Sequence, residues 1–214
     1  WETTAALLEA RRKAVPGTRP DWLPPLLEGK RVVVIGGGDT GNDCVATALR
    51  LGAASVRQLE LLPRPAVERR PGNPWPLWPF TLKTDYGQEE AAAHLGGDPR
   101  EFGVSTVAFT GTGGHLDGLD VVTVEWQDRK PVPAAGTERH LPADLVLLAM
   151  GFVGSETGLL ERLGAGKGSS YETTRPGVFL CGDMRTGQSL VLKAMEDGLS
   201  AARAVDARLR KGGA

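Results

Sequence analysis

Three glycines, Gly36, Gly38 and Gly41, follow an apolar run at Arg31–Ile35 and open a stretch with helical character at Thr40–Leu51. In this G-x-G-x-x-G spacing the first glycine allows a tight turn, and the second lets a pyrophosphate approach the backbone. The third lets the helix pack close to the strand, and the unpaired amides at the helix start can bind the anion. Because a strand precedes the motif and a helix follows it, the spacing predicts a dinucleotide-binding turn.

Charged residues near the end of the next expected strand, 55–62, bear on which dinucleotide fits. Glu60 lies about 20 residues after the third glycine, where a carboxylate can hold the ribose 2′-hydroxyl of NAD. Arg64, with Arg69 and Arg70 behind it, can instead bind the 2′-phosphate of NADPH, because guanidinium groups pair with phosphate bidentately. The arginines could equally form a solvated loop face. The sequence favours NADPH over NADH.

A second candidate anion site lies near the end of the chain. The short apolar run 178–181, expected to be a strand, is followed by Gly182 and Asp183, and a long helix is expected over 188–209. A carboxylate at this position can accept hydrogen bonds from ribose or ribityl hydroxyls, and the start of a helix can stabilise negative charge on a flavin ring. Taken alone, the stretch is also consistent with an ordinary capped loop.

Composition excludes several classes of protein. The 214 residues include 25 basic and 26 acidic ones, so net charge favours neither nucleic acid nor an acidic membrane. The longest apolar run, 145–153, is far shorter than the roughly 20 residues of a membrane span. Cys44 and Cys181 form neither a disulfide framework nor a C-x-x-C pair, and the three histidines lack metal-ligand spacing. We expect a cytoplasmic protein without a metal site.

The order of the elements predicts an α/β fold. The strand–helix–strand unit indicates a Rossmann-like parallel sheet, and the strands around Gly113-Gly114 indicate an antiparallel excursion from it. Two tryptophans in the long loop after the second strand, Trp75 and Trp78, could stack on an adenine, contact a partner chain or simply pin the loop. The further expected elements are helices over 4–15 and 85–95, strands over 104–110, 119–127 and 144–150, and a proline- and tryptophan-rich loop over 63–80.

Three segments in the same order, 36–44, 145–154 and 182–190, resemble the family of small (beta) subunits of NADPH-dependent glutamate synthase. The resemblance covers roughly residues 30 to 210, and the nicotinamide half of dihydropyrimidine dehydrogenase is similar but more distant. It implies two nested nucleotide-binding domains of the glutathione-reductase type. In this family NADPH reduces FAD, and iron–sulfur clusters carry electrons to a partner subunit that converts glutamine and 2-oxoglutarate to two glutamates.

The resemblance also implies roles for individual residues. No covalent nucleophile is expected, since in hydride transfer the cofactors supply the chemistry and the protein positions them. The positions expected to contact NADPH are Gly36, Gly38, Asp39, Thr40, Gly41, Arg64, Arg69, Arg70, Ala149 and Gly151. The positions expected to contact FAD are Gly182, Asp183, Gln188, Ser189 and Leu190.

The sequence also departs from the family pattern, because the FAD fingerprint and the cluster-ligating cysteines are missing from it. We therefore expect an N-terminal helix and linker over 1–28, an NADPH-binding domain over 29–152, and the C-terminal part of a FAD-binding domain over 153–214. The FAD site is then partial, and the chain is expected to be an inactive fragment on its own. Iron–sulfur clusters would belong to missing segments or to a partner.

The expected function is that of an electron-input module that passes hydride from NADPH to FAD for glutamate synthesis. Its expected partner is the large glutamate synthase subunit or a missing N-terminal FAD/iron–sulfur region, with no nucleic acid and no membrane. Two alternatives stay open: a related NADPH–flavin module serving another acceptor, of the ferredoxin or pyrimidine reductase type, and a non-catalytic nucleotide-binding scaffold.

Overall fold

The computed structural model describes residues 27–212. The helix expected over 4–15 lies outside these residues. The chain divides into two compact units, one ending at Met150 and the other beginning at Gly151, and each has an apolar core of its own.

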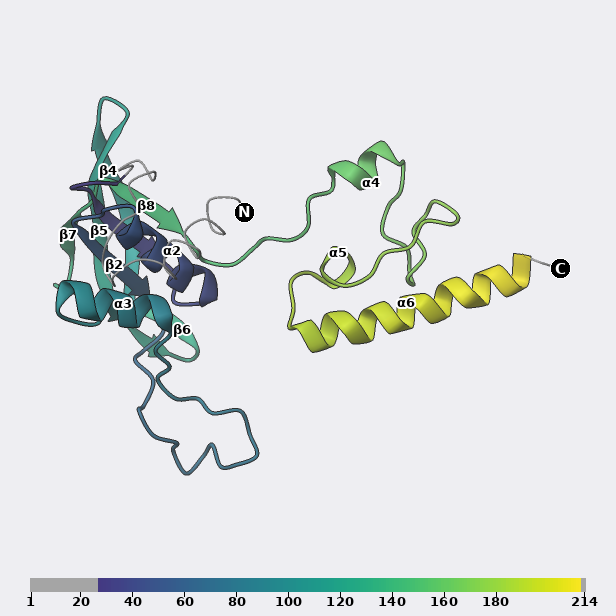
Figure 1. Cartoon of the computed structure of the whole chain (residues 1–214), viewed down its shortest axis with the longest axis horizontal. Helices are drawn as coiled ribbons and strands as arrows, with labels where there is room; N and C mark the ends of the chain where they lie inside the picture. Colours follow the sequence, from purple (N-terminus) through teal and green to yellow (C-terminus); the bar gives the residue numbers. More distant parts are fainter. Residues whose placement is uncertain (1–26, 213–214) are drawn as a thin grey trace, which may run out of the picture. The chain divides into compact units, whose positions relative to one another are not determined.

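A parallel sheet forms the centre of the first unit (Figure 1). Its strands are β1 (Arg31–Ile35), β2 (Ser55–Glu60), β3 (Arg100–Phe102) and β8 (Leu145–Leu148), in the spatial order β3-β2-β1-β8. Every neighbouring pair runs parallel. The predicted parallel sheet is confirmed, whereas β3 was not predicted because three residues are too few to show a periodicity.

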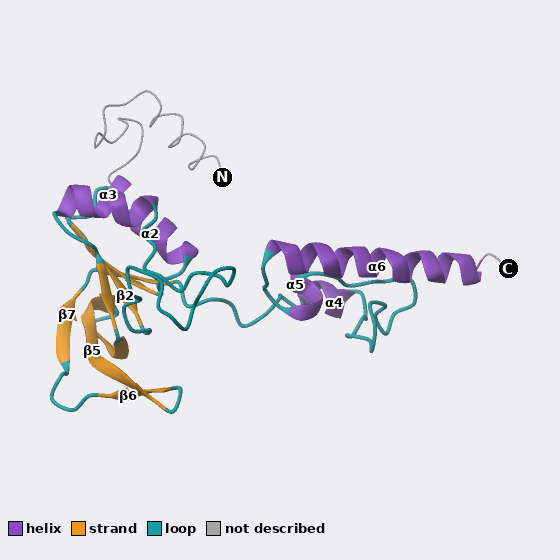
Figure 2. Ribbon diagram, turned by 90° about the horizontal axis from the view of Figure 1, so that it is seen from below, coloured by secondary structure: helices purple, strands orange, loops and turns teal. Residues whose placement is uncertain are grey.

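Two helices, α2 (Asp39–Arg50) and α3 (Tyr86–Leu95), cover one face of this sheet, and Figure 2 shows them on the same side of the strands. Val32 and Val34 of β1 pack in one apolar cluster with residues of both helices. Val33 belongs to a second cluster on the opposite face, as the two-residue period of a strand requires. Burial of both faces explains the continuous apolar character of β1.

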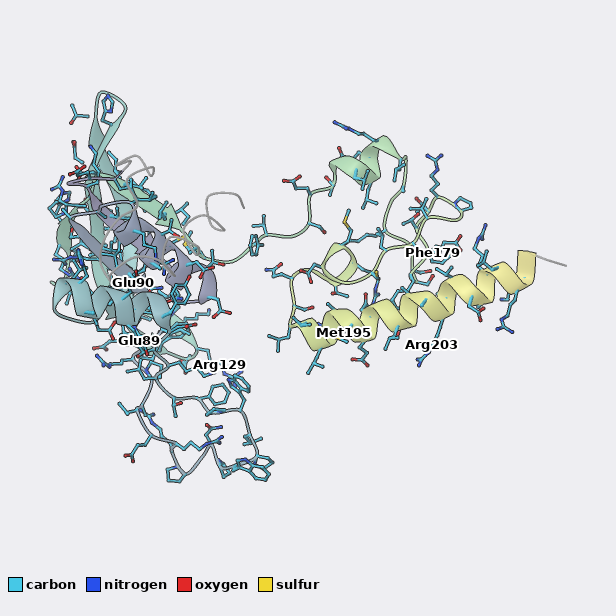
Figure 3. All side chains as sticks on the ribbon, in the orientation of Figure 1. Glu89, Glu90, Arg129, Phe179, Met195 and Arg203 are labelled. Atoms are coloured by element: carbon cyan, nitrogen blue, oxygen red, sulfur yellow. The ribbon has the colours of Figure 1, made fainter. Side chains whose placement is uncertain are left out.

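The start and the packing of α3 depend on polar side chains. Asp85 caps the helix in a capping box with Gln88, and Gly96, with φ of 82°, ends it. Arg50, the last residue of α2, donates two hydrogen bonds to Glu90 of α3 (Nη2–Oε2 2.7 Å). Figure 3 labels Glu90. The two helices are therefore joined by charge as well as by apolar contact.

The predicted antiparallel excursion is confirmed, and it is larger than expected. It consists of β4 (Val104–Thr112), β5 (His115–Gln127), β6 (Lys130–Pro133) and β7 (Arg139–Pro142), with β5 paired to the other three. The β4–β5 hairpin turns at Gly113–Gly114, and both glycines have positive φ. β6 was not predicted because it carries two prolines, which argue against a strand.

The second unit is built from helices and loops. Its helices are α4 (Gly158–Arg162), α5 (Asp183–Thr186) and α6 (Val191–Gly212). Leu160, Ala165 and Leu180 form its buried core.

Two expectations for the second unit are wrong. The run 178–181 is not a strand, and within residues 151–212 it makes one isolated bridge, between Glu172 and Phe179. A short apolar run becomes a strand only where a neighbouring strand fills its hydrogen-bonding positions. The long helix begins later than expected, at Val191, because the chain first forms α5 and then leaves helical geometry at Gly187, with φ of 81°.

No helix within residues 27–212 combines the length and the apolar character needed to cross a membrane.

Candidate functional site

The glycine turn between β1 and α2 brings backbone into close contact at two of its glycines. Gly36 has φ of 124°, and a Cβ there would lie 2.1 Å from the carbonyl oxygen of Ala149. A Cβ at Gly41 would lie 2.2 Å from the carbonyl oxygen of Gly36. At Gly38, by contrast, no atom of the described residues comes within 4 Å of the added Cβ. Two of the glycines are needed for packing, and the third leaves the turn open to a ligand.

The start of α2 offers unpaired backbone amides at this opening. The first amides of any α-helix lack intrahelical partners. Gly38 is the N-cap residue of α2, and within residues 27–212 no side-chain cap hydrogen bond is made there. Gly38, Asp39 and Thr40 are exposed, whereas Gly41 is buried. Amides of this kind, at the positive end of a twelve-residue helix, suit an anionic group such as a pyrophosphate. The geometry of the turn therefore fits a dinucleotide.

A buried polar network holds the turn from behind. Gln58 of β2 is fully buried, and its Nε2 donates to the carbonyl oxygen of Gly36 at 2.9 Å. Its Oε1 accepts from Nε2 of Gln88 at 3.1 Å. Asn42 of α2 accepts hydrogen bonds from the backbone of Gly87 and Gln88 at 3.0 and 3.2 Å. The network thus connects the turn to the start of α3.

Glu60 ends β2 beside the same turn. Its Oε2 lies 1.7 Å from the position that a Gly37 Cβ would occupy, and its Oε1 accepts from the backbone amide of Leu62 at 2.9 Å. The carboxylate is therefore directed over the glycine turn rather than away from it.

The three arginines proposed for the 2′-phosphate are not brought together. Arg64 stacks on Phe102 at the end of β3, with the guanidinium 5.7 Å from the ring centroid. Nη1 of Arg69 donates to two carbonyl oxygens of the adjoining loop, at 2.9 and 3.1 Å, and Arg70 is exposed. Among the three, Arg64 lies nearest the carboxyl end of the parallel sheet, and a role for any of them with phosphate stays a prediction.

The segment after β8 runs beside the glycine turn. The amide of Ala149 donates to the carbonyl of Ile35 at 2.7 Å, which extends the β1–β8 pairing as far as Gly36. Gly151, with φ of 87°, is the first residue of the second unit. The backbone of Ala149 therefore lies directly beside Gly36 of the turn.

Asp197 of α6 organises the candidate FAD segment in the second unit. This side chain is buried, accepts from the amide of Gly182 at 2.7 Å and forms an ion pair with Arg185. Tyr171 donates to it at 3.3 Å and stacks under the same guanidinium, 4.2 Å from the ring centroid. The hydrogen bond from Arg185 holds the pKa of Asp197 down, at about 2. Sequence analysis missed Asp197, although an acidic residue on the packed side of a helix would have been a usable signal.

The remaining FAD candidates surround this anchored loop. Asp183 is exposed at the start of α5, and Nε2 of Gln188 donates to the carbonyl of Phe152 at 2.7 Å. Oγ of Ser189 is buried without a hydrogen-bond partner among the residues that the structure describes, and Leu190 is exposed. An unpartnered hydroxyl, followed in the chain by the exposed Leu190, fits part of a polar aromatic ligand such as a flavin. Among the described residues, no group of three or more His, Cys, Asp or Glu side chains could hold a metal ion.

The curated proteins that resemble the chain include several glutamate synthases. It is 45% identical over 196 residues to the glutamate synthase [NADPH] small chain of Mycobacterium tuberculosis, covering 87% of the chain and 39% of that protein. The small chain of Bacillus subtilis is 40% identical over 195 residues, 84% of the chain and 39% of that protein. The glutamate synthase [NADH] of Saccharomyces cerevisiae is 40% identical over 225 residues, 96% of the chain and 10% of that protein. The chain thus spans well under half the length of these relatives.

Solved structures agree on the fold. The thioredoxin reductase of T. acidophilum superposes with a TM-score of 0.52 at 23% identity, covering 84% of the chain and 53% of that structure. No protein-family model matches the chain. The chain is thus similar to the glutamate synthase small chains, at 40 to 45% identity over most of its own length, and it shares the fold of the T. acidophilum thioredoxin reductase over 84% of its residues.

Proposed function

We propose that this chain is the NADPH-binding, electron-input module of a glutamate-synthase-type oxidoreductase. The observation that carries the proposal is the uncapped start of α2 beside the open Gly38, on a chain 45% identical to a glutamate synthase [NADPH] small chain. When bound, NADPH supplies a hydride from its nicotinamide ring. The protein's part is to bind and orient the cofactor.

Different residues of the first unit bind different parts of NADPH. The amides of Gly38, Asp39 and Thr40 hold the pyrophosphate, and Gly36 and Gly41 keep the turn close to its neighbours. Arg64, with Arg69 or Arg70, meets the 2′-phosphate, and Ala149 with Gly151 lies along the nicotinamide ribose. The division of the chain after residue 150 supports a domain boundary close to 152.

The second unit contributes part of a FAD site. Gly182, held by Asp197, and Asp183 face the ribityl chain, while Gln188, Ser189 and Leu190 face the ring. A complete site needs a FAD fingerprint of its own, which this sequence lacks. The rest of the site and the iron–sulfur clusters then come from other segments or from the large chain of the synthase. Both cysteines are free, which supports a reducing compartment such as the cytoplasm.

The test is a calorimetric titration of the chain with NADPH and, separately, with NADH. We expect saturable binding of both, with NADPH tighter by about tenfold, or about 1.4 kcal/mol. Failure of both nucleotides to bind would overturn the proposal, and it would also exclude the nucleotide-binding scaffold. Tighter binding of NADH would keep the module and reverse the assigned cofactor.

A further inference from the structure

Phe102, the last residue of β3, contacts two guanidinium groups. The guanidinium carbon of Arg64 lies 5.7 Å from the centroid of the ring, and that of Arg100 lies 5.5 Å from it. Both distances are within the range of a cation–π contact, about 6 Å. The ring is half-buried, so the sheet holds it in place while part of its surface stays accessible to a stacked side chain.

The hydrogen-bonding capacity of Arg100 is used inside the fold. Its side chain is only 7% exposed, and it donates to both carboxylate oxygens of Asp98, at 2.8 and 2.9 Å. It also donates to Oγ1 of Thr84 at 3.1 Å and to the carbonyl of Lys83. Arg100 therefore joins β3 to the segment before α3, and it supports Phe102 rather than a ligand.

Arg64 differs from Arg100 in both respects. It is exposed, and it makes no hydrogen bond or ion pair with another of the residues 27–212. The charge of Asp98 also acts on Arg64, but Arg100 already pairs with that carboxylate. A guanidinium stacked flat on a ring keeps the N–H groups at its edge for a ligand. Stacking also fixes in advance a side chain that would otherwise lose rotamer freedom on binding.

The strand register places Phe102 at the edge of the sheet that carries the glycine turn. Phe102 pairs with Glu60 of β2, whose carboxylate lies over Gly37. Neighbouring strands are about 4.8 Å apart, so Phe102 lies one strand away from the residue nearest the expected ribose. Beyond the two strands, the amide of Gly103 donates to the carbonyl of Leu62 at 3.0 Å. This bond keeps the chain that leads to Arg64 beside Phe102.

We propose that Phe102 is a positioning residue for the 2′-phosphate of NADPH: its ring holds the Arg64 guanidinium at this edge of the sheet, with the N–H groups available to the phosphate. This inference rests on the proposed function and adds a residue that acts on cofactor choice through Arg64. Guanidinium groups bind phosphate bidentately, which demands a defined orientation. NADH carries no phosphate at this position, so the orientation of Arg64 matters to NADPH alone.

The test is calorimetric titration of Phe102→Leu with NADPH and, separately, with NADH. Leucine keeps an apolar side chain in β3 but removes the ring. NADPH binding should weaken about threefold, the effect of losing an exposed cation–π contact, and NADH binding should stay unchanged. Phe102→Tyr keeps the ring and should bind both nucleotides as the unaltered chain does. Phe109→Leu, at an exposed phenylalanine of β4, is the matched control and should change neither affinity.

A double-mutant cycle separates positioning from a general effect on the fold. In the Arg64→Ala background no guanidinium is left for the ring to orient toward the phosphate. Adding Phe102→Leu should therefore cause no further loss of NADPH affinity, so the two substitutions should be non-additive. A merely structural role of Phe102 would instead weaken NADPH binding in both backgrounds and NADH binding with it.

Three results would overturn the inference about Phe102 and leave the proposed function standing. They are equal losses for NADPH and NADH in Phe102→Leu, an unaltered NADPH affinity in that variant, and a loss of the same size in the Arg64→Ala background. A different result, in which the unaltered chain binds neither nucleotide, would overturn the proposed function and the role of Phe102 together.

Discussion

The side-chain nitrogen of Gln58 donates a hydrogen bond of 2.9 Å to the carbonyl oxygen of Gly36, the first glycine of the turn between β1 and α2. Gln58 is fully buried in the middle of β2, and its other end accepts from Gln88 at the start of α3. Hydrogen bonds in a buried, low-dielectric setting are strong when complete and costly when broken. The shape of the turn therefore depends on a side chain from the neighbouring strand.

Replacing this side chain by an apolar one of similar size should destabilise the first unit. Gln58→Leu leaves the Gly36 carbonyl and the Gln88 amide buried without their partner, at a cost of about 1–3 kcal/mol for each group. Urea unfolding followed by circular dichroism measures the loss. Gln127→Leu, an exposed glutamine at the end of β5, is the control and should change the free energy of unfolding little. An unaltered midpoint for Gln58→Leu would mean that the network contributes nothing.

The local parts of the site were predictable from sequence, and the long-range parts were not. The order of β1, turn and α2 follows from spacings within twenty residues, where periodicity and glycine positions carry the information. The contacts of Gln58 join residues 22 and 30 positions apart. Its burial could have been suspected, because it shares a strand face with the buried Val56. Its partners depend on how α3 packs, which periodicity does not encode.

In the second unit, too, the long-range contacts could not be predicted from local sequence. The run 178–181 has the composition of a strand but no strand beside it among residues 151–212, so local preference was overridden. Asp197, which holds Gly182, lies 15 positions further along the chain. Likewise, the loop of residues 66–81 is held by hydrogen bonds between Asn73 and the backbone of Trp78 and Phe80, which no sequence motif indicates.

Two glycines of the turn should have different roles: Gly36 is needed for packing, and Gly38 for contact with the ligand. Gly36→Ala should destabilise the fold by about 1–3 kcal/mol or more, because its Cβ would collide with the backbone of Ala149. Gly38→Ala should leave the free energy of unfolding nearly unchanged, since its Cβ enters open space. It should nevertheless weaken NADPH and NADH binding alike, by about tenfold or more, because the methyl group stands where the pyrophosphate approaches. Unaltered affinity in Gly38→Ala would remove the turn from the nucleotide site.

Arg64 should decide between the two nicotinamide cofactors. Arg64→Ala should weaken NADPH binding about tenfold and NADH binding little, because only NADPH carries a 2′-phosphate. Calorimetric titration of both nucleotides measures the ratio. Arg203→Ala, an exposed arginine of α6, should leave both affinities unchanged. Equal losses for the two nucleotides in Arg64→Ala would exclude the 2′-phosphate role.

Replacing Glu60 should change the preference between NADPH and NADH in the opposite direction from replacing Arg64. Its carboxylate is directed over the turn, beside Gly37, where a negative charge repels a 2′-phosphate and favours a ribose hydroxyl. Glu60→Gln should therefore raise the ratio of NADPH to NADH affinity, by about fivefold at this half-buried position. A lower ratio would show that the carboxylate does not face the ribose.

The ion pair of Asp197 makes the stability of the second unit depend on acid. The pKa of Asp197 is held at about 2 by Arg185, below the value of about 3.9 expected in an unfolded chain. The ion pair therefore stabilises the folded unit fully at pH values above the pKa of the unfolded chain. This stabilisation is lost as the pH falls through the pKa of the folded state.

Asp197→Asn should lower the melting temperature at neutral pH, because it removes the charge that meets Arg185 and holds the Gly182 amide. The difference between variant and unaltered chain should shrink as the pH falls from 4 toward 2, where Asp197 itself becomes neutral. Differential scanning calorimetry across this range measures it, with Asp206→Asn, an exposed carboxylate of α6, as the control. A difference that stays constant with pH would mean that Asp197 acts through its shape and hydrogen bonds rather than through its charge.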